Sequence, residues 1–199
     1  ITNCTITGNT APNGNGGGIY TKKTDDSKAS TITIKDGAII GGIGPGEANK
    51  ATGTGSGGNG GGIYAESDLT MTRCTVSNNT VSDSSGLGGG GIYAAGRLTM
   101  QGCTISGNYA KKDGGGIYAV GNLSLTDCTV TANESQNNGY GSSPGSGSGG
   151  GIYIKGRCTM TGGSVTGNKA NSNGKGGGIY IDGNGSFTMT GVTVSSNTT

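Results

Sequence analysis

The sequence is poor in several residue types that commonly decide a protein's class. Among 199 residues it has no tryptophan, no histidine, one phenylalanine and three prolines. No run of 18 apolar residues occurs, so the chain contains no transmembrane helix by this criterion. The low proline count and the lack of a three-residue glycine period exclude collagen. With 13 basic and 11 acidic residues, a formal charge of +2 does not suggest a nucleic-acid partner.

Large core-forming side chains are scarce as well. Leucine, isoleucine, valine and phenylalanine make up only about 15% of the chain, whereas glycine contributes 47 residues. Such a composition usually indicates disorder, but disorder of that class normally accompanies a high net charge, which this chain does not have. A fold is still possible if the few apolar residues are arranged periodically.

An internal repeat supplies that periodicity. The motif Gly-Gly-Gly-Ile-Tyr occurs six times, with its isoleucine at Ile19, Ile63, Ile92, Ile117, Ile152 and Ile179. A second block of the form Leu-Thr-Met-Thr-x-Cys-Thr-Ile-Ser-x-Asn follows each copy, as in residues 69–79. Residues 32–42 form a degenerate copy and residues 3–9 the tail of another, so the chain contains about seven units.

Within each unit the apolar residues alternate with polar ones, as they do in β-strands. Leu69 and Met71 are expected to point inward, and Thr70 and Thr72 outward. Each unit offers three such segments, and each is too short to bury its apolar face alone. The pattern therefore predicts an all-β fold, a three-sided parallel β-solenoid of about seven rungs, in which residues 1–199 form a single segment.

Asparagine and glycine occupy the predicted corners. Asparagine tolerates left-handed backbone conformations, and its amide can bond to the same amide one rung away. We therefore predict a structural ladder of Asn9, Asn79, Asn108, Asn133, Asn168 and Asn197.

These motifs resemble known repeats. Gly-Gly-Gly-Ile together with Ile105–Asn108, Val165–Asn168 and Val76–Asn79 is similar to the repeats of the polymorphic outer membrane protein family, although aliphatic residues replace that family's phenylalanine. More broadly, the chain resembles right-handed parallel β-helix proteins of pectate-lyase-like fold. The resemblance implies a right-handed coil and a secreted or cell-surface bacterial protein with a binding role.

Length variation and the chain ends suggest further expectations. The variable stretches 43–59, 80–87, 134–148 and 169–175 should leave from one corner and form a ridge, either for binding or as tolerated insertions. The chain begins in mid-unit and stops after a unit's asparagine without a capping element. We therefore expect a segment of a longer chain or of a continuous fibre.

The cysteines fit a structural role. Cys4, Cys74, Cys103 and Cys128 are predicted to share one inward column, occupied in other rungs by Gly37, Gly163 and Val192, while Cys158 occupies the leucine column. Because small or apolar residues replace cysteine at these positions in other rungs, we predict that the thiols are buried and free. The alternatives are a single disulfide or binding of a metal. Without histidine or a Cys-x-x-Cys motif a zinc site has no basis, so we predict no metal and no cofactor.

Catalysis has no obvious candidate in the sequence. Acidic residues do not recur in neighbouring rungs: Glu66 and Asp68 are followed by Ala95 and Arg97, so that Asp68 and Arg97 are expected to form an ordinary surface pair. The acidic residues of one irregular rung, Asp25, Asp26 and Asp36, could hold at most an adventitious cation. We expect no catalytic residues.

Two outward ladders are candidates for binding. The first consists of Tyr20, Tyr64, Tyr93, Tyr118, Tyr153 and Tyr180, which could stack on one another to set the register or form an exposed platform for glycans or a neighbouring subunit. The second is made of threonines on two faces, for example Thr70, Thr99 and Thr159. It is similar to the ice-binding face of some solenoid antifreeze proteins, but threonine is also favoured in any strand.

Together these features favour a non-catalytic extracellular or cell-surface segment acting as adhesin passenger, stalk or fibre subunit. Its partners would be further copies of itself, head to tail or laterally, a glycan or a surface protein, and not nucleic acid. A carbohydrate-binding or polysaccharide-cleaving β-helix is the main alternative, and an ice-binding solenoid the third.

Overall fold

The structure is a computed structural model in which every regular element of the described residues is a short β-strand. It describes residues 1–23, 31–44, 46–53, 58–82, 85–136, 147–171, 173–183 and 185–199. The strands form four sheets, which we number in the order in which the chain passes through them within one repeat.

Sheets I and II contain the first two predicted segments of each unit. Sheet I consists of β3 (Ile19–Thr21), β7 (Ile63–Ala65), β11 (Ile92–Ala94), β15 (Ile117–Ala119), β19 (Ile152–Ile154) and β23 (Ile179–Ile181). Sheet II consists of β4 (Thr31–Lys35), β8 (Asp68–Thr72), β12 (Leu98–Gln101), β16 (Leu123–Thr126), β20 (Cys158–Thr161) and β24 (Phe187–Thr190).

Sheet III contains the third predicted segment, and sheet IV follows the asparagine that ends each unit. Sheet III consists of β1 (Thr5–Ile6), β5 (Ile39–Ile40), β9 (Thr75–Ser77), β13 (Thr104–Ser106), β17 (Thr129–Thr131), β21 (Ser164–Thr166) and β25 (Thr193–Ser195). Sheet IV consists of β2 (Thr10–Ala11), β6 (Lys50–Ala51), β10 (Thr80–Val81), β14 (Tyr109–Ala110), β18 (Glu134–Ser135) and β22 (Lys169–Ala170).

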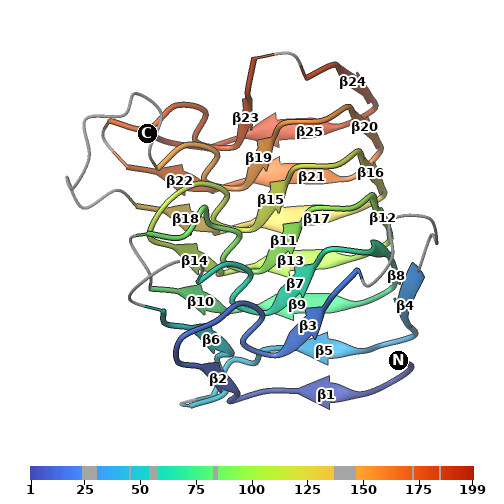
Figure 1. The fold of residues 1–199 in the computed structure, drawn as a ribbon. Helices are drawn as coiled ribbons and strands as arrows, with labels where there is room; N and C mark the ends of the chain where they lie inside the picture. Colours follow the sequence, from blue (N-terminus) through green and yellow to red (C-terminus); the bar gives the residue numbers. More distant parts are fainter. Residues whose placement is uncertain are drawn as a thin grey trace.

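Each strand pairs in parallel with its counterparts in the rungs above and below, as Figure 1 shows for the whole stack. The register follows the repeat: Ile92 lies between Ile63 and Ile117, and Leu98 between Leu69 and Leu123. The seven strands of sheet III correspond to seven rungs, which confirms the predicted all-β parallel solenoid of about seven rungs.

Sheets I, II and III enclose the main core. Ile92, Leu98, Met100 and Ile105 of one rung are each at most 1% exposed, and the equivalent residues of neighbouring rungs cover them on both sides. Burying an aliphatic side chain of this size contributes about 1.5–3 kcal/mol. The periodic arrangement therefore compensates for the small number of large apolar residues.

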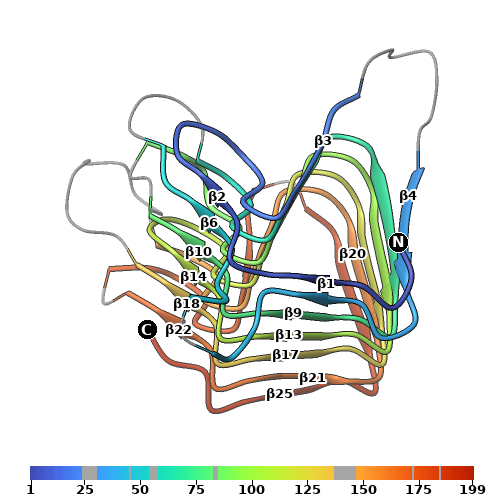
Figure 2. The same cartoon turned by 90° about the horizontal axis from the view of Figure 1, so that it is seen from below.

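Sheet IV lies on an arm beside sheet I, as the view along the coil in Figure 2 shows. It encloses a second, small core of Ala51, Val81 and Ala110. The four ranges predicted to be variable loops, 43–59, 80–87, 134–148 and 169–175, therefore contain β6, β10, β18 and β22. That prediction was wrong in part, because a strand of two residues is too short to show alternation of apolar and polar side chains. Some of the remaining loop residues lie outside the described part.

Length variation also occurs at a second corner, between sheets I and II. Two residues separate β7 from β8, whereas residues 22–30 separate β3 from β4 and residues 182–186 separate β23 from β24. The expectation that all insertions leave from one corner is therefore corrected.

The three glycines before each isoleucine have different reasons to be glycine. In one rung Gly114 has a φ of 63°, a left-handed conformation that side chains disfavour. A Cβ on Gly115 would lie 2.3 Å from the Gly150 carbonyl oxygen, and one on Gly116 would lie 3.0 Å from the amide carbon of Asn133. The run is thus tightly packed between the next rung and the asparagine ladder.

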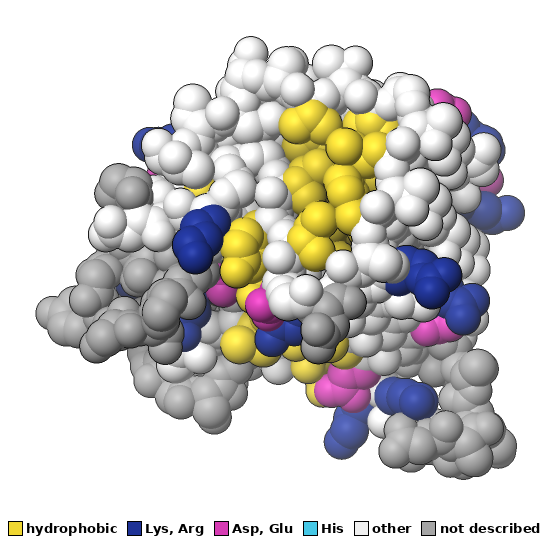
Figure 3. All heavy atoms as spheres, turned by 90° about the horizontal axis from the view of Figure 1, so that it is seen from above, with side chains coloured by type: hydrophobic (Ala, Val, Ile, Leu, Met, Phe, Trp, Pro, Cys, Tyr) yellow, Lys and Arg dark blue, Asp and Glu magenta, His cyan; other side chains and the backbone are white. Residues whose placement is uncertain are grey.

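Figure 3 looks onto the end of the coil formed by β23, β24 and β25, where hydrophobic side chains gather over the interior. Met189 and Val194 are 44% and 45% exposed there, in contrast to their buried counterparts in inner rungs.

Candidate functional site

The asparagine ladder is a continuous buried hydrogen-bond network. The backbone N–H of Asn108 and its Nδ2 both donate to Oδ1 of Asn133, at 3.0 and 2.9 Å. Asn108 Nδ2 also donates to the Val76 carbonyl at 2.9 Å, and its Oδ1 accepts from Asn79. All six predicted asparagines, Asn9, Asn79, Asn108, Asn133, Asn168 and Asn197, lie in this ladder.

The ladder has a seventh member that sequence reasoning missed. Asn49 lies between Asn9 and Asn79, accepting a bond from Asn9 Nδ2 and donating one to Asn79 Oδ1, both at 2.9 Å. It had been assigned to a variable loop, because extra residues separate it from the preceding strand β5. The recurrence of Asn directly before a sheet IV strand is the signal that would have identified it.

The tyrosines form one stacked column on the outer side of sheet I. Neighbouring ring centroids are 4.6–5.2 Å apart, and from Tyr20 to Tyr153 the rings are within 11° of parallel. Tyr93, Tyr118 and Tyr153 are only 7%, 1% and 7% exposed, whereas Tyr20 is 48% exposed. The expectation of a fully exposed platform of Tyr20, Tyr64, Tyr93, Tyr118, Tyr153 and Tyr180 is therefore wrong for the three middle rings.

Carboxylates lie against both halves of this column. Glu66 accepts a hydrogen bond from the Tyr20 hydroxyl at 3.3 Å, and Asp182 accepts one from the Tyr153 hydroxyl at 2.8 Å. Burial, followed by neighbouring tyrosines and Glu66, raises the pKa of Tyr64 to about 12. The phenols near these carboxylates stay neutral and act as hydrogen-bond donors at physiological pH.

Asp113 is the most perturbed carboxyl near the column. Its Oδ1 accepts the backbone N–H of Ser148 at 2.8 Å, yet burial raises its pKa to about 6. The ammonium of Lys155 lies 5.8 Å from the ring centre of Tyr118, close enough for a cation–π contact. Two carboxylates from different rungs, Asp113 and Asp182, both act electrostatically on Tyr118. Comparing acidic residues at equivalent positions of neighbouring repeats does not predict this, because the two occupy different positions of the repeat.

All five cysteines are free thiols, and Cys4, Cys74, Cys103 and Cys128 share one column. Cys4 is exposed, which corrects its assignment to a buried position, because it lies in the first rung and has no neighbour below. Ala38 and not Gly37 aligns with the column. The Cys74, Cys103 and Cys128 thiols each donate to the backbone carbonyl two residues earlier, at 3.2–3.4 Å. Cys158 is buried in sheet II, as its leucine-like position predicts.

The hydroxyl-bearing faces are in register. On sheet II, Thr99 lies between Thr70 and Ser124, and on sheet III Thr104 lies between Thr75 and Thr129. Gln101 and Ile39 interrupt the two arrays, at positions where the neighbouring rungs carry threonine.

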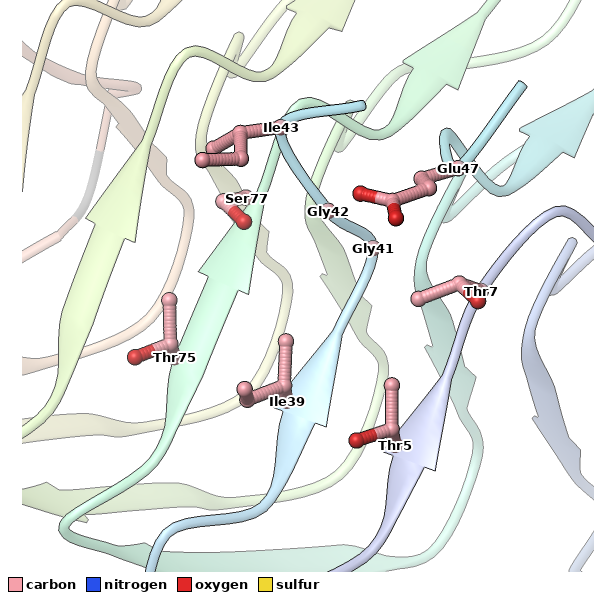
Figure 4. Close-up of a pocket in the computed structure, with 9 residues that line it drawn as sticks. All are labelled: Thr5, Thr7, Ile39, Gly41, Gly42, Ile43, Glu47, Thr75 and Ser77. Carbon is pink, nitrogen blue, oxygen red and sulfur yellow. The ribbon is translucent and has the colours of Figure 1, made fainter. Parts of the chain in front are cut away.

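A hollow of about 310 Å³ lies at the Ile39 interruption on the outer face of sheet III (Figure 4). It is lined by Thr5, Thr7, Ile39, Gly41, Gly42, Ile43, Glu47, Thr75 and Ser77. Strands β1, β5 and β9 supply its floor, and the segment that follows β5 supplies its wall. Sequence reasoning did not find this hollow.

Three further acidic residues, Asp36, Asp68 and Glu134, have ordinary surface partners. Asp36 pairs with Arg73 and Lys35, while Asp25 and Asp26 lie outside the described residues. Asp68 accepts the backbone N–H of Arg97 at 2.9 Å, so their contact uses the main chain of the arginine. Within the described ranges, no three His, Cys, Asp or Glu side chains gather as metal ligands would, and no helix is long and apolar enough to cross a membrane.

A family model described as right-handed β-helix region matches residues 1–199, the whole chain. The chain belongs to the right-handed β-helix family. No curated protein and no solved structure matches it. For this β-helix, family membership establishes the coil and its handedness; its activity, partners and location are matters for proposal.

Proposed function

We propose that this β-helix is a non-catalytic extracellular or cell-surface segment of a bacterial protein, acting as adhesin passenger, stalk or fibre subunit. The observation that carries the proposal is the unbroken asparagine ladder, which continues from Asn9 to Asn197 across every rung. A coil with the same contacts at every level is suited to span a distance and to present side chains at fixed intervals.

The energetics of the ladder support a rigid spacer. Each inner asparagine links its own rung to both neighbours, and a buried hydrogen bond contributes about 0.5–1.5 kcal/mol, whereas leaving a buried donor or acceptor without a partner costs about 1–3 kcal/mol. Bending or sliding one rung against the next would break several such bonds together. The coil therefore resists deformation at every rung.

The ladder also has a direction, which bears on self-association. Each asparagine before Asn197 donates through Nδ2 to Oδ1 of the following asparagine, and all of these except Asn49 also donate through the backbone N–H. A further rung, from the same chain or from a second copy, continues this pattern only head to tail. Head-to-tail association is therefore the form of self-contact that the ladder favours.

Two assays on the 199-residue chain test the proposal. A glycan array tests binding, and incubation with polygalacturonate and related polysaccharides, followed by mass spectrometry, tests for cleavage products. We expect glycan or surface binding without product release if the chain is an adhesin, and neither if it is a stalk. Product release by the purified chain would refute the non-catalytic proposal.

A carbohydrate-binding or carbohydrate-cleaving role is the second candidate. It is favoured by the raised pKa of Asp113, a carboxyl that acts electrostatically on Tyr118 and Tyr153, as Asp182 also does. Such a carboxyl is suited to proton transfer near neutral pH. If product is released, Asp113→Asn should abolish it, whereas Asp68→Asn, a half-buried site elsewhere on the coil, should not.

Ice binding is the third candidate, favoured by the in-register threonines of sheets II and III. Thermal hysteresis measured at high protein concentration tests it. A freezing-point gap would support this role, and its absence would remove it.

A further inference from the structure

The outer face of sheet III departs from its pattern at one place. In the column that contains Thr5, Thr75 and Thr104, the residue on β5 is Ile39, which is 39% exposed. A second isoleucine, Ile43, is 94% exposed just after the same strand. Two accessible isoleucines beside a hollow, on a face otherwise formed by threonine and serine, distinguish this location from every other rung of sheet III.

The hollow is held in shape by the segment between β5 and the ladder residue Asn49. The Glu47 carbonyl accepts the N–H of Gly8 at 3.0 Å, and the Gly42 carbonyl accepts Nδ2 of Asn78 at 2.7 Å. These bonds attach the segment to the rungs on both sides. Figure 4 shows Thr5, Ile39 and Thr75 pointing the same way from adjacent strands, with the segment after β5 at one end of the row.

The lining has a simple chemistry: an aliphatic floor and a single charged group. Ile39, Ile43 and the threonine methyl groups supply the apolar surface, and Glu47 is the one ionisable residue among the nine that line the hollow. Glu47 Oε2 accepts the N–H of Gly44 at 2.6 Å, which orients the carboxylate. A carboxylate offers about four lone-pair sites, so it retains capacity for a ligand.

We propose that this hollow binds a small organic cation with a short aliphatic body, an alkylammonium, whose charged group bonds to Glu47 while its chain covers Ile39. A volume of about 310 Å³ is at the lower end of the range for small-molecule sites, so the ligand is short. Charge complementarity selects a cation, because the lining residues include one carboxylate and no basic side chain. The apolar floor selects an alkyl chain over a ligand covered with hydroxyl groups, which would need more polar partners.

Nuclear magnetic resonance with ¹³C-labelled isoleucine methyl groups tests the proposal on the 199-residue chain. The probes are hexylammonium, hexanol and hexanoate, which share a chain and differ in their head group. We expect saturable shifts of Ile39 and Ile43 with hexylammonium, and at least about tenfold weaker binding of hexanoate, because a charge-assisted hydrogen bond is replaced by repulsion.

Two variants separate the contributions of the carboxylate and the floor. Glu47→Gln should weaken hexylammonium about tenfold and leave hexanol unchanged. Ile39→Thr, which restores the residue found on the neighbouring strands and so preserves the fold, should weaken both probes. Glu134→Gln, a matched change at an exposed carboxylate on sheet IV, should weaken neither.

A peptide with a single lysine, compared with hexylammonium, distinguishes a protein source of the cation from a small molecule. The proposal predicts that free hexylammonium binds at least as tightly as the peptide. Equal affinity for all three head groups, no effect of Glu47→Gln, tighter binding of the peptide or no saturable shift at Ile39 would each overturn it.

Discussion

Replacing Asn108 by alanine tests the role of the asparagine ladder most directly. The side chain is 1% exposed and makes bonds in three directions: to Val76 O, to Asn133 Oδ1 and from Asn79. Alanine leaves the Asn79 backbone N–H without this partner inside the protein, whereas the Val76 carbonyl lies in the parallel pairing of β9 with β13 and keeps its backbone bond there. Asn79 Nδ2 and Asn133 Oδ1 each keep another bond.

The magnitude follows from one orphaned backbone group and the loss of the side-chain bond to Val76 O. A buried group without a partner costs about 1–3 kcal/mol and a lost buried hydrogen bond about 1 kcal/mol, so Asn108→Ala should lower the free energy of unfolding by about 2–4 kcal/mol. Asn197 occupies the equivalent position in the last rung and is itself half-buried, so water can reach the groups that Asn197→Ala releases, and this change should cost about 1 kcal/mol or less. Asn122→Ala, an exposed asparagine whose Oδ1 accepts a 3.3 Å bond from Arg157 N, serves as the control, with an expected change within about 0.5 kcal/mol.

Urea unfolding followed by circular dichroism, with midpoint and slope reported together, measures these differences. A changed slope would show that single rungs unfold separately, as nearest-neighbour coupling in repeat proteins allows. The reasoning would be refuted if Asn108→Ala and Asn122→Ala had the same midpoint, because the ladder would then contribute nothing beyond solvent-exposed hydrogen bonds.

Three further predictions concern the tyrosine column, Asp113 and the thiols. The Tyr118 hydroxyl makes no hydrogen bond with the described residues, so Tyr118→Phe should change the free energy of unfolding by less than about 1 kcal/mol. Tyr118→Ala, which removes the whole ring, should lower it by about 3–5 kcal/mol in thermal or urea unfolding. The Asp113 pKa of about 6 exceeds its ordinary value of 3.8, so the folded state binds the proton more tightly and stability should rise as pH falls. Lowering the pH from 7.5 to 5 should add about 1.4 kcal/mol from this group in urea unfolding, and a titration that is identical in Asp113→Asn would contradict the assignment. A thiol reagent such as dithionitrobenzoate should react quickly only with the exposed Cys4 in the folded chain, and with all five cysteines in denaturant. Fast reaction of a second thiol in the folded chain would show that the coil opens.

Much of the architecture could be predicted because it depends on local alternation. Leu69 and Met71 face inward for the same reason as Leu98 and Met100, and parallel in-register stacking brings equal positions together. Six ladder asparagines and the cysteine column follow from that register. The sequence prediction misses Asn49 and places Gly37 instead of Ala38 in the cysteine column, because their rung is degenerate and counting residues from its motif gives the wrong offset.

The candidate sites could be predicted less well. Whether Tyr118 is exposed depends on the arm that lies beside sheet I, and the strands of that arm, at two residues each, are too short to show alternation of apolar and polar side chains. Asp113 and Asp182 both act electrostatically on Tyr118, although they lie 69 positions apart and belong to different rungs and different corners. The hollow beside Ile39 depends on the longer connection between β5 and Asn49, which supplies Gly42, Ile43 and Glu47 to its lining.

The sequence by itself determined the coil, its rung count and the contents of its main core, because the repeat specifies which side chains face inward and parallel pairing then aligns them. Only the tertiary structure decided the fourth sheet, the burial of the middle tyrosines, the raised pKa of Asp113 and the hollow at Glu47. Each of these features depends on how connections of unequal length pack against a neighbouring rung. Such contacts do not repeat from unit to unit, so the sequence pattern does not predict them.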